Sequence, residues 1–229
     1  MRTIIQTPTG KLDTSLKYFA TLDFEILSLN DINYVTDGNV IIEVNPDRNA
    51  RTGIKLIKSD WKAEVLELKE ITTVLKTKEG YLTNDPSGAW IYLIESNAES
   101  IPALNENINS KLGDFAGISI ESISFKTSKK IWEILGFKTT MGGEDQGWVS
   151  LKNSEDFTIS IMTANSCPHL FFNPSLTYFN GEKNLAIIDW IRKSGVSIAE
   201  EITTFNEQGI ADNIVLQDPG GLGFFLFSD

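Results

Sequence analysis

The stretch from which the fold follows is Asp218–Asp229, DPGGLGFFLFSD, at the end of the chain. Asp-Pro before two glycines is typical of a turn, because proline fixes φ and glycine accepts a positive φ. The apolar and aromatic residues 222–227 after it predict a strand that is buried on at least one face. The same order occurs at Asp85–Ile94, where DPSGAWIYLI leads from a turn into an apolar strand.

A second pair of segments indicates an internal repeat. Ser15–Phe24, SLKYFATLDF, aligns without a gap on Ser128–Phe137, SKKIWEILGF. Self-similarity over such distances indicates a repeated structural unit. The 229 residues therefore contain one design written twice, as two domains of about 100 residues each.

The first copy has the pattern of two βαβββ units. In the first unit a strand at 2–7 and a helix ending near Ala20 precede strands at 24–29, 33–36 and 40–44. The second unit repeats this order between residues 53 and 94, with one of its strands predicted at 72–77. We place the first domain at 1–97, followed by a linker at 98–115 that is rich in Asn, Ser and Glu.

The second copy, placed at 116–229, repeats the same two units. Here the pattern predicts a strand at 117–125, a helix at 128–135 and strands at 147–151 and 157–162. The glycine-rich segment 141–147 joins strands and is predicted to be a hairpin loop, since a phosphate cradle needs the N–H groups of a helix behind the glycines. Segment 163–175 is predicted to be irregular.

Composition and charge limit the class of protein. An apolar fraction of 41% with 22% charged residues is typical of a globular chain. The 20 basic and 31 acidic residues give a net charge of −11, which disfavours nucleic-acid binding because that affinity comes from clustered Lys and Arg. A single cysteine, Cys167, allows no internal disulfide, and no apolar run approaches membrane-spanning length. We expect a cytoplasmic protein without a signal peptide.

These units and motifs resemble the vicinal-oxygen-chelate superfamily, which includes glyoxalase I, bleomycin-resistance proteins and extradiol dioxygenases. The motifs are SKKIWEILGF after the first strand of the second copy and DPGGLGFFLF at its end. The resemblance implies an α+β fold in which four βαβββ units pair into two curved-sheet glyoxalase/bleomycin-resistance-like domains, each around a cleft. We expect the two domains to pack on each other, and whether they do so as the subunits of a family dimer stays open.

The resemblance provides a test for a metal site. In metal-using members the ligands come from the first and last strands of a unit, and the last-strand Glu corresponds here to Tyr92 and Phe225. Only Gln6 and Glu43 offer donors at such positions. The single histidine, His169, excludes a dioxygenase of the extradiol kind, whose members use two His and one Glu. We predict no cofactor, with a divalent metal at Gln6 and Glu43 as the alternative.

The leading hypothesis is a metal-independent protein that binds a small, partly apolar or aromatic ligand in a cleft. Two alternatives stay open: a divalent-metal-dependent lyase or isomerase of the glyoxalase type, and a structural or partner-binding protein with filled clefts. No catalytic residue is assigned, and neither nucleic acid nor a membrane is an expected partner, whereas a homodimer stays open. The predicted ligand-binding residues are Gln6, Glu43, Tyr92, Glu121, Trp148, Tyr178 and Phe225.

Overall fold

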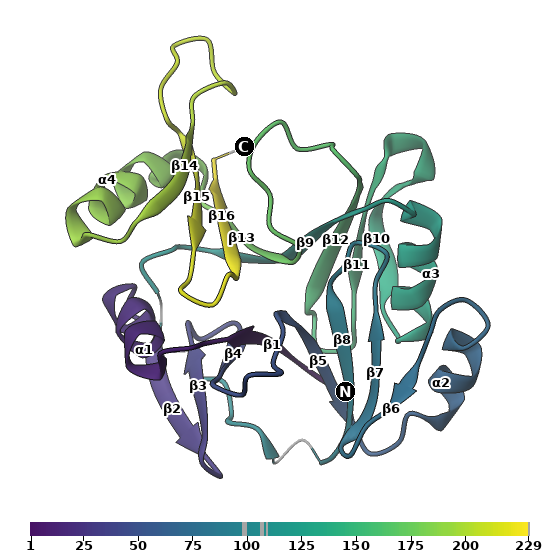
Figure 1. Cartoon of the computed structure of the whole chain (residues 1–229). Coiled ribbons are helices and arrows are strands. Elements are labelled where there is room, and N and C mark those ends of the chain that lie inside the picture. Colours follow the sequence, from purple (N-terminus) through teal and green to yellow (C-terminus); the bar gives the residue numbers. More distant parts are fainter. Residues whose placement is uncertain (98–99, 106–107, 109, 229) are drawn as a thin grey trace.

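The computed structural model of the chain describes residues 1–97, 100–105, 108 and 110–228 (Figure 1). In these residues two eight-stranded mixed sheets are combined with four α-helices, one helix for each βαβββ unit. The α+β class and the four predicted units are thereby confirmed. No helix in this described part is long and apolar enough to cross a membrane.

The first half builds one sheet and the second half the other. The first contains β1 (Arg2–Pro8), α1 (Leu12–Thr21), β2 (Glu25–Leu29), β3 (Ile32–Thr36), β4 (Ile41–Asn45), β5 (Gly53–Lys58), α2 (Lys62–Leu68), β6 (Leu75–Lys76), β7 (Gly80–Asn84) and β8 (Trp90–Glu95). The second contains β9 (Phe115–Ser122), α3 (Phe125–Ile134), β10 (Lys138–Gly143), β11 (Trp148–Lys152), β12 (Thr158–Thr163), β13 (Ser175–Phe179), α4 (Asn184–Ser194), β14 (Ile198–Ile202), β15 (Asn213–Gln217) and β16 (Gly223–Phe227).

Both sheets have the same strand order. The first is β2-β3-β4-β1-β5-β8-β7-β6 and the second is β10-β11-β12-β9-β13-β16-β15-β14. Within each unit the first strand runs parallel to the last, and the two units of a sheet meet through antiparallel first strands. This order gives each sheet a pseudo-twofold arrangement about its central pair of strands. The limits predicted for the two domains, 1–97 and 116–229, stay a prediction.

The pleat of each sheet separates a core face from a cleft face, since successive side chains on a strand point to opposite sides. On β1, β4, β5 and β8 the register pairs Ile5 with Ile42 and Ile54, and Ile54 with Ile91. All four are fully buried, in a hydrophobic core that also contains the apolar faces of the helices and residues of the second half. The alternate residues of the same strands therefore lie on the cleft face.

Buried aspartates join the two halves. Asp85, in the Asp-Pro turn before β8, accepts hydrogen bonds from Ser128 Oγ at 2.7 Å and Trp132 Nε1 at 3.0 Å, both on α3. Asp218, in the matching turn before β16, accepts from Thr7 Oγ1 on β1 at 2.8 Å. Burial raises the pKa of both carboxyls, that of Asp218 to about 6. The repeated turn thus joins the two halves. The helices α2 and α3, one from each half, are also in contact and lie on the same side of the molecule in Figure 1.

The structure corrects several predicted boundaries. Residues Lys138–Gly143 form β10, so the predicted hairpin loop at 141–147 begins too early. The strand is hard to predict from the sequence because its glycines are typical of a turn. Gly142 has φ +75°, and a Cβ there would lie 2.5 Å from the carbonyl oxygen of Trp148 on the paired strand. The helix of the third unit begins at Phe125 instead of 128, and the strand predicted at 72–77 is limited to Leu75–Lys76.

Candidate functional site

Equivalent positions on the two sheets define two clefts. In the first, the register of the parallel pairs places Gln6 opposite Glu43 and Lys55 opposite Tyr92. The same pairs in the second sheet place Ser119 opposite Ser160 and Thr177 opposite Phe225. The two clefts therefore share one geometry but present different chemistry, a charged and polar row in the first and hydroxyls with an aromatic ring in the second.

A charged network occupies the floor of the first cleft. Lys55 Nζ lies 2.6 Å from Glu43 Oε2, and the two side chains are only 12% and 7% exposed. The amide of Asn45 donates to Glu43 Oε1 and to Gln6 Oε1, both at 2.9 Å. Gln6 Nε2 in turn donates to the carbonyl oxygen of Arg51 at 2.8 Å, so every polar atom of Gln6 and Glu43 has a protein partner.

Tyr92 closes one end of this network. Its hydroxyl donates to the carbonyl oxygen of Arg51 at 3.2 Å and accepts from the Arg51 backbone N–H at 3.3 Å. The ring also lies 5.8 Å from Lys55 Nζ, at the outer limit of a cation–π contact. The predicted residues Gln6, Glu43 and Tyr92 are thus brought together, with a lysine between them.

The second cleft contains an apolar cavity of about 280 Å³. The Phe225 and Phe227 rings of β16 stack beside it, with centroids 5.2 Å apart and planes at 8°. Thr177 Oγ1 donates to the carbonyl oxygen of Gly117 at 2.9 Å, whereas in the described part of the chain the Ser119 and Ser160 hydroxyls have no hydrogen-bond partner. The residues lining the cavity are Ala116, Ser119, Trp148, Ser160, Met162, Cys167, Phe171, Thr177, Phe225 and Phe227.

Residues 163–174, here called the lid, cover this cavity. Glu121 on β9 holds the lid, since its carboxylate accepts the backbone N–H of Cys167 at 2.7 Å and that of Asn165 at 3.1 Å. Asn173 Oδ1 accepts the Glu121 N–H at 2.8 Å. The His169 ring stacks on Phe225, with centroids 4.7 Å apart and planes at 25°. The lid therefore contributes part of the aromatic wall of the cleft.

The lid cysteine is not an activated nucleophile. Burial, together with the hydrogen bond and charge of Glu121, raises the pKa of Cys167 to about 12. Nucleophilic cysteines need a thiolate, which a cationic neighbour would favour and a carboxylate disfavours. Its sulfur lies 3.8 Å from Met162 Sδ, so Cys167 contributes to the cavity as an apolar side chain.

Solved structures of known proteins share this arrangement of units over nearly the whole chain. A 2,3-dioxygenase, LapB, from Pseudomonas sp. KL28 matches 97% of this chain and 89% of its own, with a TM-score of 0.59 and 15% identity. A catechol 2,3-dioxygenase matches 97% and 85%, with a TM-score of 0.55 and 12% identity. The Mn(II)-bound glyoxalase from Novosphingobium aromaticivorans matches 97% and 79%, with a TM-score of 0.55 and 15% identity.

The chain has the vicinal-oxygen-chelate fold. At this identity the likeness concerns the fold and not the activity of those enzymes, because one fold carries many functions. No protein-family model and no curated protein matches the sequence.

The residues at the metal-ligand positions of the vicinal-oxygen-chelate fold do not fit a divalent metal. In the first cleft the Lys55 ammonium is already the cation beside Glu43, and Gln6 Oε1 is used by Asn45. In the second, Ser119 and Ser160 offer neutral hydroxyls and no charged oxygen. Divalent metals need converging nitrogen, sulfur or carboxylate donors, and the described residues contain no group of three such side chains. The metal-dependent alternative therefore lacks a donor set.

Tyr178 is the predicted site residue that the vicinal-oxygen-chelate fold places elsewhere. It follows Thr177 on β13, so its side chain points away from the cleft, and it is fully buried. Its hydroxyl donates to Asp37 Oδ2 of the first half at 2.8 Å, and burial raises the pKa of both groups. The prediction of Tyr178 as a ligand-binding residue is wrong by one position of the strand alternation.

The other predicted residues lie at or beside the two clefts. Trp148 and Phe225 line the second cavity, whereas the Glu121 carboxylate is engaged by the lid. Sequence reasoning did not select Lys55 or Ser160. Both residues can be identified from the alternation of side chains along the strands together with the parallel register. This register pairs Lys55 with Tyr92 and Ser160 with Ser119.

Proposed function

We propose that the second cleft binds a small aromatic molecule that carries a hydroxyl or carbonyl group. The observation that carries this proposal is the cavity of about 280 Å³, with stacked rings on one wall and unpartnered hydroxyls on the floor. Ligand sites are typically apolar with a few polar groups that fix orientation, and this volume lies just below their usual range of about 300–1,000 Å³. A single substituted ring is the size that suits it.

The polar group of the ligand would bind at Ser119 and Ser160. The Ser119 residue is 8% exposed, and the Ser160 hydroxyl lies opposite it on the neighbouring strand. Each hydroxyl can donate one hydrogen bond and accept others, so the pair accommodates either a phenol or a ring carbonyl. Phe225 and Phe171 would contact the faces and edges of the ring, where aromatic pairs are most favourable.

The open cavity also argues against the alternative of a protein with filled clefts. The first cleft contains a separate cavity of about 400 Å³, so neither sheet is closed by its own side chains. A cytoplasmic location and a homodimer stay predictions from the sequence.

The experiment compares 4-methylphenol with toluene, which differ by the hydroxyl group. Binding is followed by quenching of Trp148 fluorescence, and a Trp148→Phe variant identifies that signal among the five tryptophans. We expect 4-methylphenol to bind about fivefold more tightly than toluene, the value of about one hydrogen bond.

The matched variant is Ser119→Ala/Ser160→Ala. It should bind toluene as the native chain does and lose the preference for 4-methylphenol. If neither compound changes the fluorescence, or if the preference survives in the variant, the proposed ligand class is wrong.

A further inference from the structure

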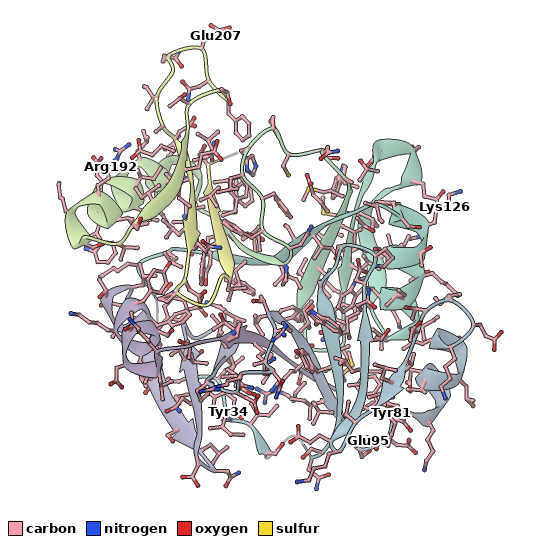
Figure 2. All side chains as sticks on the ribbon, in the orientation of Figure 1. Tyr34, Tyr81, Glu95, Lys126, Arg192 and Glu207 are labelled. Atoms are coloured by element: carbon pink, nitrogen blue, oxygen red, sulfur yellow. The ribbon has the colours of Figure 1, made fainter. Side chains whose placement is uncertain are left out.

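The first cleft contains a cavity that the proposed function does not use. It measures about 400 Å³ and lies between strands β3 and β4 of the first unit and β5 and β8 of the second. The β6–β7 turn, with Lys78 and Glu79, forms one edge, and the segment containing Ser100 and Ile101 forms another. Figure 2 labels Tyr34 on the β3 side and Glu95 on the β8 side of this cavity.

Tyr34 supplies an unpaired hydrogen-bond donor in this cavity. The residue is 3% exposed, and no hydrogen bond joins its hydroxyl to the described part of the chain. Burial, followed by the charges of Glu43 and Glu79, raises the pKa of Tyr34 to about 12, so its proton is retained at neutral pH. The Tyr34 hydroxyl is not fully enclosed, since Tyr18 is the described residue whose hydroxyl is both buried and unpartnered. The Tyr34 donor is therefore accessible to an acceptor atom of a ligand that enters the cavity.

Lys55 supplies further donors beside it. An ammonium group has three N–H donors. Within the described residues Lys55 Nζ uses one of them, toward Glu43, and both side chains line the cavity. The two Glu43 oxygens already accept hydrogen bonds from Lys55 and Asn45. The polar groups left without a partner on the floor of the cavity are therefore hydrogen-bond donors. Such donors fit an acceptor oxygen of a ligand, and an ammonium favours a carboxylate.

The opposite charge is available at the edge of the cavity. Three carboxylates, Glu43, Glu79 and Glu95, line it against the two ammonium groups of Lys55 and Lys78. Glu43 is paired with Lys55, and Glu95 with Lys76 at 3.0 Å, whereas Glu79 forms no ion pair with any described residue. With Lys76 counted, three carboxylates face three ammonium groups, so the charges of the site balance. The Glu79 carboxylate is the one left to accept the ammonium group of a ligand.

Between these groups the wall is aliphatic, formed by Ile4, Ile32, Ile57, Ile94 and Ile101. Ile4, Ile57 and Ile101 belong to a small buried cluster of their own on this face of the sheet. We propose that the first cleft binds a free α-amino acid with an apolar side chain. Its carboxylate would bind Lys55 and Tyr34, its ammonium group Glu79, and its side chain the isoleucines.

Calorimetric titration of the full chain tests this with three compounds that share the isobutyl group of leucine. L-leucine has both charged groups, 4-methylpentanoate lacks the ammonium group, and 3-methylbutylamine lacks the carboxylate. We expect leucine to bind at least about tenfold more tightly than either truncated compound, since each charged group contributes a charge-assisted hydrogen bond. Equal affinities for leucine and 4-methylpentanoate, or no binding of leucine, would overturn the proposal.

Variants assign the ends of the ligand. Tyr34→Phe and Lys55→Met should each weaken leucine binding, and Glu79→Gln should weaken leucine without weakening 4-methylpentanoate. Lys126→Met is the matched lysine control, because that side chain is 79% exposed and lies far from the labelled cavity residues Tyr34 and Glu95 in Figure 2. If Lys55→Met does not fold, Tyr34→Phe and Glu79→Gln still decide the outcome. Unchanged leucine binding in both of these variants contradicts the assignment.

Discussion

The Glu43–Lys55 pair gives the sharpest test of how the first cleft is held together, through the variant Lys55→Met. Methionine keeps most of the aliphatic length of lysine but leaves Glu43 without its cation. Because the two side chains are only 12% and 7% exposed, the carboxylate cannot recover full hydration. Breaking a buried ion pair costs about 3–5 kcal/mol.

We expect the lower end of that range, about 3 kcal/mol, because Asn45 still donates to Glu43 Oε1. For a chain of this length such a loss lowers the melting temperature by roughly 6–12 °C. The double variant Glu43→Gln/Lys55→Met removes the unpaired charge and should recover most of the loss. Urea unfolding of the four proteins gives the coupling energy directly.

The result that would refute this argument is additivity. If the double variant is as unstable as the two single losses combined, the carboxylate and the ammonium are not energetically coupled, and the short contact is not the reason for the stability of the cleft. A loss below about 1 kcal/mol for Lys55→Met, as for exposed pairs, would also contradict it.

Three further predictions concern Asp218 between the halves, the lid and strand β10. Burial raises the folded-state pKa of Asp218 from its usual 3.8 to about 6, so its contribution to stability is full well below pH 4 and falls by about 2 kcal/mol between pH 4 and pH 6. Unfolding of the native chain and of Asp218→Asn at pH 4 and pH 6 should show that difference. Glu121→Gln should speed iodoacetamide labelling of Cys167 at pH 8 by at least about tenfold, since it lowers the pKa of the thiol and loosens the lid; an unchanged rate would exclude this role of Glu121. Gly142→Ala should destabilise the chain by about 2 kcal/mol more than Gly136→Ala. Both glycines have a positive φ, but a Cβ meets a carbonyl oxygen at 2.5 Å in the first case and nothing within 4 Å in the second. Equal losses would contradict the steric reason given for β10.

Most of the fold could be predicted from the internal repeat of the sequence. The turn-strand motif at Asp85 and Asp218 and the helix alignment of Ser15 with Ser128 locate equivalent elements, because turns and helix faces have local sequence signals. Boundaries failed where the signal is not local. The glycines of β10 are required by the close approach of another strand, which nothing in residues 138–143 themselves reveals.

The candidate site was predictable only in part for the same reason. Tyr92 and Phe225 could be placed in the clefts from their distance to the Asp-Pro turn. Tyr178 and Thr177 are neighbours on one strand, and a shift of one residue exchanges cleft for core. The cavities depend on the lid and on the segment around Ile101, whose positions are set by tertiary contacts.

The alternation of β1 and β13 divides two tasks between adjacent residues. Gln6 faces the first cleft while Thr7 binds Asp218 of the other half, and Thr177 faces the second cleft while Tyr178 binds Asp37. The surface of each cleft and the contacts between the halves thus lie on opposite faces of the same strands. Substitutions at every second position of these strands therefore change the surface of a cleft without removing the hydrogen bonds that join the halves.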